Sequence, residues 1–144
     1  MSGAAGAGGG GDAGGAGDPT PEQRGEHVYD LYRRGSELLE RGDFAAAAIP
    51  LEQARSFEPD KTSIREALGR AYFHAQRYAE ARDEFAAVVE QYPTNDFAHF
   101  CLGRAFELTG DKRRARHHLT MAATMRPDRA DYRKYRDRIR RRAA

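Results

Sequence analysis

The sequence lacks the features that mark secreted, membrane-bound or disulfide-linked proteins. It contains a single cysteine, Cys101, so no disulfide can form within the chain, which is compatible with a reducing cytoplasm. No hydrophobic run approaches the length that a membrane span requires. The N-terminus also lacks the basic start and apolar stretch of a secretory signal. We therefore expect a cytoplasmic protein that does not associate with a membrane.

Motifs for catalysis and for cofactor binding are lacking as well. The adjacent residues His117 and His118 are a poor metal pair, since neighbours on a helix point about 100° apart. Adding His99 and Cys101 does not give a spacing typical of zinc sites. We find no phosphate-binding glycine loop between a strand and a helix, and no nucleophile paired with a base. The sequence predicts a protein that is not an enzyme and that holds no metal or cofactor.

Glycine is abundant in only one part of the chain. Ten of the 15 glycines lie within the first 25 residues, among alanines and almost nothing large enough to bury. Such a segment cannot offset the entropy lost on ordering, so residues 1–25 are predicted to form a disordered tail. The tail is either a tether or a segment without a role, and we favour the second interpretation. The domain is then expected to span residues 26–142.

In the remaining sequence, four kinds of position recur at a fixed interval of 34 residues. They hold a glycine, an alanine, a large apolar residue and a proline, namely Gly35, Gly69 and Gly103; Ala47, Ala81 and Ala115; Leu51, Phe85 and Leu119; Pro59, Pro93 and Pro127. A period of this length is typical of repeats that fold as two helices joined by a turn. It predicts an all-α protein with a capping helix at 130–142 and repeats at about 28–61, 62–95 and 96–129.

The regular glycines within the predicted helices need an explanation, because glycine inside a helix costs about 1 kcal/mol relative to alanine. Helices approach each other closely only where side chains are short. We expect the repeated glycines of the first helices to lie opposite the repeated alanines of the second helices. Between the helices of the first repeat, Gly42 is predicted to end one helix and Asp43 to cap the next.

These positions resemble the tetratricopeptide repeat (TPR) family over residues 28–129, with the capping helix following. The matching residues are Leu31, Gly35, Leu38, Gly42, Phe44, Ala47, Leu51, Ala54 and Pro59; Leu68, Gly69, Tyr72, Tyr78, Ala81, Phe85, Val88 and Pro93; Leu102, Gly103, Phe106, Gly110, Ala115, Leu119, Ala122 and Pro127. Arg65 and His99 depart from the pattern, since the family usually has an aromatic residue there. The resemblance implies a short right-handed superhelix of three helical hairpins.

The resemblance also implies a function. In this family the first helices line a concave groove that binds an extended peptide or a partner's helix, which favours a non-catalytic adaptor or scaffold. Aromatic residues and arginine often dominate binding at interfaces, so we expect an apolar or aromatic ligand segment with an acidic group opposite Arg70 and Arg104. Alternatively, the aromatic residues pack the hairpins or receive the N-terminal tail. The groove candidates are Tyr29, Tyr32, Ser36, Leu39, Glu66, Arg70, Phe73, His74, Phe97, Phe100 and Arg104.

One branch of the family binds the acidic C-terminal tails of chaperones through lysine and asparagine side chains. The matching groove positions of this chain carry no positive charge, and they are Tyr32, Ser36, Ala67, Phe97 and Cys101. We therefore expect the chain not to bind such tails.

The net charge of +2 hides a strong asymmetry, because residues 1–110 carry −7 and residues 111–144 carry +9. A basic end can attract nucleic acid or an acidic protein, and it can also attract the acidic body of a second copy. The simpler interpretation, which we favour, is a solvated capping helix whose charges suit its C-terminus. The candidates for polyanion binding are Arg133, Lys134, Arg136, Arg138, Arg140 and Arg141.

Overall fold

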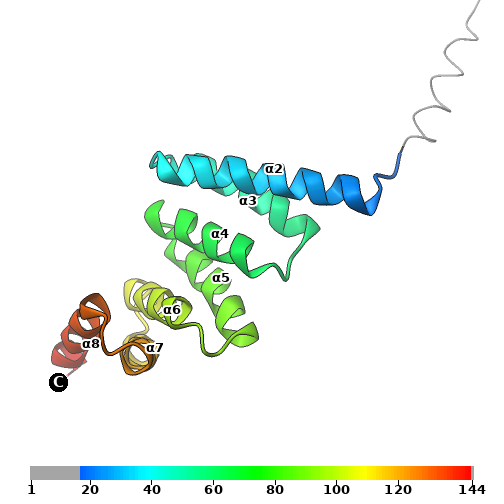
Figure 1. Ribbon diagram of the computed structural model, residues 1–144. Helices are drawn as coiled ribbons and strands as arrows, with labels where there is room; N and C mark the ends of the chain where they lie inside the picture. Colours follow the sequence, from blue (N-terminus) through cyan, green and yellow to red (C-terminus); the bar gives the residue numbers. More distant parts are fainter. Residues whose placement is uncertain (1–16, 144) are drawn as a thin grey trace, which may run out of the picture.

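The computed structural model describes residues 17–143, and within them it contains seven helices and no strand. Each helix packs against its neighbour in the sequence, so the chain forms a row of hairpins with the last helix at the end (Figure 1). The predicted all-α class is confirmed. The helices are α2 (Pro21–Glu40), α3 (Phe44–Phe57), α4 (Thr62–His74), α5 (Tyr78–Gln91), α6 (Asp96–Leu108), α7 (Lys112–Met125) and α8 (Ala130–Ala143).

Helix α2 begins earlier than the predicted tail boundary at residue 25 allows. Thr20 and Gln23 form a capping box, in which the Thr20 hydroxyl accepts from the Gln23 backbone N–H at 3.1 Å and the Gln23 side chain accepts from the Thr20 N–H at 2.8 Å. Pro21 occupies the first turn, where its missing N–H costs nothing. The tail prediction was wrong for residues 21–25, and residues 1–16 lie outside the described part of the chain.

The turns inside the hairpins share one backbone conformation. Gly42 and Gly110 have φ values of 82° and 92°, and Gln76, at the equivalent position of the middle hairpin, has a φ of 65°. This left-handed conformation suits glycine and ends a helix, as predicted for Gly42. Asp43 makes no side-chain capping bond, contrary to the prediction, whereas the equivalent Asp111 accepts from the Arg114 backbone N–H at 3.1 Å.

The repeated glycines lie against large side chains of the second helices. A Cβ atom placed on Gly35 would lie 2.5 Å from Cγ of Leu51, and one on Gly69 would lie 2.8 Å from the ring of Phe85. Gly103 has the same relation to Leu119, at 2.8 Å. The atoms nearest to these glycines thus belong to the large apolar residues and not to the repeated alanines. The alanines are buried nearby, but the glycines provide the space that a leucine or phenylalanine fills.

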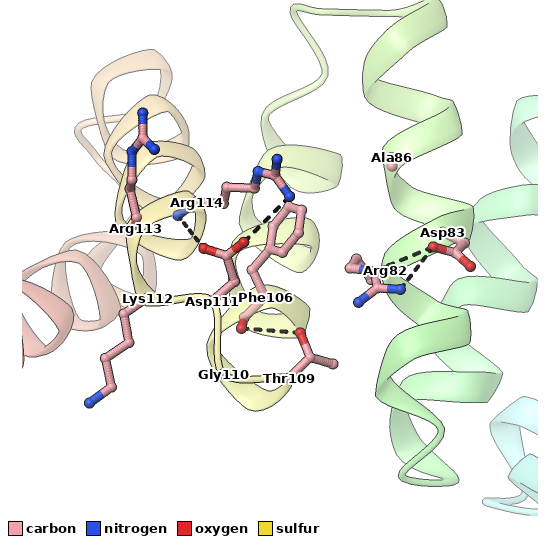
Figure 2. Close-up of a pocket in the computed structure, with 10 residues that line it drawn as sticks. All are labelled: Arg82, Asp83, Ala86, Phe106, Thr109, Gly110, Asp111, Lys112, Arg113 and Arg114. Atoms are coloured by element: carbon pink, nitrogen blue, oxygen red, sulfur yellow. Dashed lines mark hydrogen bonds and ion pairs between the residues drawn. The ribbon is translucent and has the colours of Figure 1, made fainter.

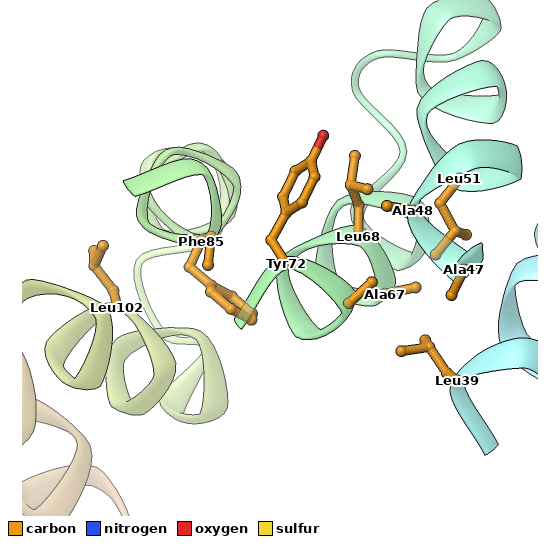
Figure 3. Packing of buried hydrophobic residues seen from close by; sticks show 11 residues of the cluster. Leu39, Ala47, Ala48, Leu51, Ala67, Leu68, Tyr72, Phe85 and Leu102 are labelled. Atoms are coloured by element: carbon orange, nitrogen blue, oxygen red, sulfur yellow. The ribbon is translucent and has the colours of Figure 1, made fainter. Parts of the chain in front are cut away.

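The largest hydrophobic cluster crosses three hairpins and joins them into one body (Figure 3). Leu39 of α2 and Leu51 of α3 contribute from the first hairpin, Tyr72 and Phe85 from the second, and Leu102 from the third. At the C-terminal end, α8 inserts Ile139 beside α7 and Tyr132 beside the last turns of that helix. Both side chains are fully buried, so α8 covers the apolar end of the array as a capping helix does.

The substitution Gly35→Ala tests the close approach of α2 and α3. Its new methyl group would overlap Leu51, which is fully buried, so the two helices must separate. We expect the free energy of unfolding to fall by about 1–3 kcal/mol, although alanine favours the helix itself. Urea unfolding followed by circular dichroism measures the change.

Gly25→Ala is the matched control, because Gly25 lies in the same helix and a Cβ atom placed on it would meet nothing within 4 Å. There we expect a gain of about 0.5–1 kcal/mol from helix propensity alone. If both variants gained stability, the contact with Leu51 would not limit the approach of the helices.

Candidate partner-binding site

A pocket opens between the first helices of the second and third hairpins. Its volume is about 180 Å³, and α4, α5 and α6 supply its lining residues. Aromatic side chains form much of the lining, and two arginines and one histidine surround them. The lining residues are Arg70, Phe73, His74, Phe85, Phe97, Phe100, Cys101 and Arg104.

Contacts with the core hold the aromatic side chains in place. Phe97 stands edge-on to Phe85, with ring centroids 6.4 Å apart, and 37% of Phe97 remains exposed. Phe100 stacks on Tyr132 of α8 at 4.7 Å. Asn95 begins α6 by accepting from the Ala98 backbone N–H at 3.0 Å. The pocket is therefore built on rigid elements, and Phe97 is its most accessible aromatic side chain.

The two arginines of the pocket differ in their surroundings. The Arg104 guanidinium lies 4.1 Å from the ring centroid of Tyr135, and its Nε is 3.6 Å from the Glu107 carboxylate. Its charge therefore has a carboxylate partner inside the protein, which it shares with Arg138 and Arg142 of α8. Arg70 is exposed and forms no ion pair among residues 17–143. Of the two, Arg70 is the one that has a free charge.

The structure brings together six of the predicted groove residues in this pocket: Arg70, Phe73, His74, Phe97, Phe100 and Arg104. Tyr29, Tyr32 and Ser36 lie on α2, outside the pocket lining. Leu39 is a buried core residue, so its assignment to the groove surface was wrong. Glu66 accepts a hydrogen bond from the Asn95 side chain at 2.9 Å and thereby ties α4 to the start of α6.

Two further residues line the pocket, and of these only Cys101 was predicted at a groove position. Phe85 was assigned to the core by its repeat position, yet its ring also borders the pocket. The Cys101 thiol faces the same pocket, and burial raises its pKa strongly. A thiol with a raised pKa remains protonated at neutral pH and is a weak nucleophile. Cys101 therefore serves as a small apolar lining residue.

Two carboxylates have nearly buried side chains, at 4% exposure for Glu84 and 6% for Glu107. Glu84 of α5 accepts hydrogen bonds from Arg55 and from Arg65, the latter at 3.0 Å, and so links three helices. Glu107 of α6 accepts from Arg138 at 2.8 Å. Both are surrounded by arginines, as buried carboxylates require, and their contacts are those of structural ion pairs.

The basic end is only partly free to bind an anion. Of the predicted polyanion-binding residues, Arg136 pairs with Asp137 at 2.9 Å and Arg138 pairs with Glu107. Arg133 donates to the backbone carbonyl of Pro127. Lys134, Arg140 and Arg141 are exposed and form no ion pair among the described residues.

His99 and His118 form a buried pair between α6 and α7. His99 Nε2 must donate to the Pro93 carbonyl at 2.7 Å, because a carbonyl can only accept. In the neutral pair, His99 Nδ1 then accepts from His118 Nδ1 at 3.0 Å. Burial, together with the nearby His99, His117 and Arg114, lowers the pKa of His118 to about 4. Within residues 17–143, no group of three potential metal ligands includes this pair.

Comparison with known proteins supports the resemblance seen in the sequence. A family model described as Tetratricopeptide repeat matches residues 32–96, which cover most of the first two hairpins. Together with the row of stacked hairpins, this match confirms the resemblance to the TPR family. In the described part of the chain, none of the helices combines the length and the apolar composition that a bilayer crossing needs.

A curated relative, the inactive TPR repeat-containing thioredoxin TTL3 of Arabidopsis thaliana, is 28% identical over 109 residues. The match covers 76% of this chain and 16% of the relative, so the chain spans a small part of that protein's length.

Solved structures share the fold at low sequence identity. The C-terminal TPR-containing domain of an FK506-binding protein from Plasmodium falciparum has a TM-score of 0.81 at 20% identity, covering 88% of this chain and 94% of that one. The first TPR domain of Spaghetti (RPAP3), bound to the HSP90 peptide SRMEEVD, has a TM-score of 0.76 at 14% identity, covering 82% and 94%. The CopN-Scc3 complex has a TM-score of 0.66 at 17% identity, covering 83% and 68%.

The histidine pair predicts that stability depends on pH. Because the folded state keeps the pKa of His118 below its ordinary value of about 6.5, the unfolded state binds more protons between pH 6.5 and 4. We expect the free energy of unfolding to be highest above pH 6.5 and to fall as the pH decreases toward 4. Urea unfolding at about pH 7 and pH 5 measures how much the free energy of unfolding falls between the two. In the variant His118→Phe this fall should be smaller than in the wild type.

His27→Gln is the control, since it removes an exposed histidine of α2. If His118→Phe and His27→Gln changed the pH dependence equally, the buried pair would not be its source.

Proposed function

We propose that the chain is a non-catalytic interaction module, an adaptor or scaffold, which holds a peptide or a partner's segment in the pocket between α4 and α6. The observation that carries this proposal is the cluster of aromatic side chains that the structure leaves accessible beside an unpaired arginine. Two of the similar solved structures are complexes with a peptide or a protein, which supports the proposal by analogy.

The size of the pocket favours a side chain over a small-molecule cofactor. Ligand pockets for small molecules commonly have volumes of about 300–1,000 Å³, whereas this pocket has about 180 Å³. One aromatic or branched aliphatic side chain of a partner can fill it and contact Phe97 and Phe100. Such an anchor desolvates the centre of a contact, where binding energy concentrates.

The charges of the pocket favour an acidic group beside that anchor. Arg104 already contacts Glu107 and is partly buried, whereas Arg70 is exposed and has no ion pair among the described residues, so the expected acidic contact with both arginines reduces to a contact with Arg70. Arg70 lines the pocket from α4, within the same opening as Phe97 from α6. The proposed ligand is therefore a segment with one large apolar residue and a nearby aspartate or glutamate.

Selection from a random-peptide phage library on the full chain tests this proposal. Enriched peptides should share a large apolar residue near an acidic one, and synthetic copies should bind in fluorescence-polarisation assays. Phe97→Ala should weaken binding by about tenfold or more, since it removes an anchor contact, and Arg70→Glu should do the same by charge reversal.

Phe57→Ala is the control, because Phe57 is an exposed aromatic residue of α3 outside the pocket. The affinity of this variant for the selected peptides should match that of the wild type. The HSP90 peptide SRMEEVD should show no micromolar binding, since the clamp positions carry no cation. Enriched peptides that lack the apolar residue, or that bind Phe97→Ala as tightly as the wild type, would contradict the proposal.

A further inference from the structure

A second hollow lies between α7 and α8, and its lining is cationic. Its volume is about 430 Å³, and its charged lining residues come from both helices, with Arg113 and Arg116 on α7 and Arg140 on α8. All three arginines are exposed. The remaining lining residues are His117, Thr120 and Met121, so none of them is a carboxylate. We call these six residues the α7–α8 groove.

The arginines of the α7–α8 groove differ from most arginines of the basic end because they have no ion-pair partner. Among residues 17–143, no carboxylate lies within salt-bridge distance of Arg113, Arg116 or Arg140. Six other arginines of this end contact a carboxylate, and their pairs are Arg114–Asp111, Arg126–Asp128, Arg129–Asp131, Arg136–Asp137, Arg138–Glu107 and Arg142–Glu107. Arg133 and Arg141 of α8 form no ion pair among the described residues, and they add to the positive charge beside the groove. The free positive charge of the basic end is therefore concentrated in the groove and beside it.

The positive charges of this region also act on Asp137, a carboxylate of α8. A hydrogen bond from Arg136 lowers the pKa of Asp137, and the positive charges of Arg140 and Arg141 lower it further. Asp137 thus offsets Arg136 and leaves the groove arginines uncompensated.

In the larger hollow between α5 and the α6–α7 turn, carboxylates also line the opening and pair with two of its arginines (Figure 2). There Arg82 pairs with Asp83 at 3.3 Å and Arg114 pairs with Asp111 at 3.4 Å. The side chains of Lys112 and Arg113 point away from α5 in Figure 2. An anion in that hollow would compete with the carboxylates already bound, whereas one in the α7–α8 groove would not.

We propose that the α7–α8 groove binds the phosphate backbone of a nucleic acid without reading its sequence. Protein interfaces depend on aromatic or aliphatic anchors at their centre, and the groove offers only the half-buried Met121. A nucleic acid presents dense, regular negative charge, which matches a groove of unpaired arginines and a hydroxyl. The site lies on other helices than the α4–α6 pocket and does not depend on its function.

The surrounding aromatic residues explain why no stacking on the bases is expected. Tyr132 is fully buried, and Tyr135 is covered by the guanidinium groups of Arg104 and Arg138 at 4.1 and 4.4 Å from its ring centroid. Neither ring is free to stack on a base, so backbone charge is left as the source of affinity.

Fluorescence anisotropy with a labelled mixed-sequence DNA duplex and an RNA single strand tests this site in the full chain. Both probes should bind at about 50 mM salt and lose affinity steeply toward about 200 mM, since bound arginines release counterions. The triple variant R113Q/R116Q/R140Q should lose at least about tenfold in affinity and reduce the magnitude of the log–log salt slope by about 2–3.

Two further variants separate the groove from net charge and from folding. R33Q/R34Q/R41Q changes the net charge equally with exposed arginines of the first hairpin, and it should keep the wild-type slope. R113K/R116K/R140K keeps the charge and should retain most of the affinity, because phosphate contact needs only a cation. Circular dichroism confirms that each variant is folded.

Three results would contradict the proposal. Absence of binding to both nucleic-acid probes at about 50 mM salt would do so, as would equal losses in the groove variant and the R33Q/R34Q/R41Q control. If polyglutamate of equal charge competed as well as the nucleic acids, the groove would be a site for acidic polypeptides instead.

Discussion

The structure depends on the contact between a glycine in the first helix of each hairpin and a large apolar side chain in the second. Without a Cβ atom on Gly69, the buried ring of Phe85 can lie directly on the backbone of α4. The same ring then stands edge-on to Phe97 and borders the α4–α6 pocket. The distance between two helices thus determines where the third hairpin places its accessible aromatic residue, so the glycine contact sets the geometry of the proposed binding site.

Two further repeated positions, one on each helix of a hairpin, hold chemically different residue pairs in the three hairpins. Arg65 and Glu84 form a buried ion pair in the second hairpin, and the residues 34 positions later, His99 and His118, form a hydrogen-bonded pair. The equivalent positions of the first hairpin hold Leu31 and Pro50, both buried and apolar. Each pair is self-consistent, since a lone charge or an unpaired imidazole at this depth would cost several kcal/mol. The departures from the family pattern at Arg65 and His99 are therefore matched by changes in their partners.

The sequence predicted the fold because the repeat period is a local property, recorded in residue types at fixed spacing. The helix class, the family resemblance and the turn at Gly42 followed from it, and six pocket residues followed from helical spacing within the family pattern. The predictions that differ from the structure concern contacts between helices. Periodicity alone could not show that Leu39 faces inward or that the glycines meet Leu51, Phe85 and Leu119. The early start of α2 could have been predicted, because Thr20, Pro21 and Gln23 form a capping motif that is recognisable in the sequence. It was missed because the surrounding segment is rich in glycine.

Glu107 explains why a count of charges misjudges the basic end. Its carboxylate, only 6% exposed, contacts Arg104 of its own helix and Arg138 and Arg142 of α8. One buried carboxylate thus contacts three arginines and holds α8 against α6, although it offsets only one of their charges, so part of the positive charge near the C-terminus is structural. Arg104, held in this way beside Tyr135, also closes one side of the α4–α6 pocket. The same carboxylate therefore removes positive charge from the pocket, where Arg70 remains, and leaves the unpaired arginines on the outer faces of α7 and α8. Charge in this chain is divided by tertiary contacts into a part that joins helices and a part available to partners.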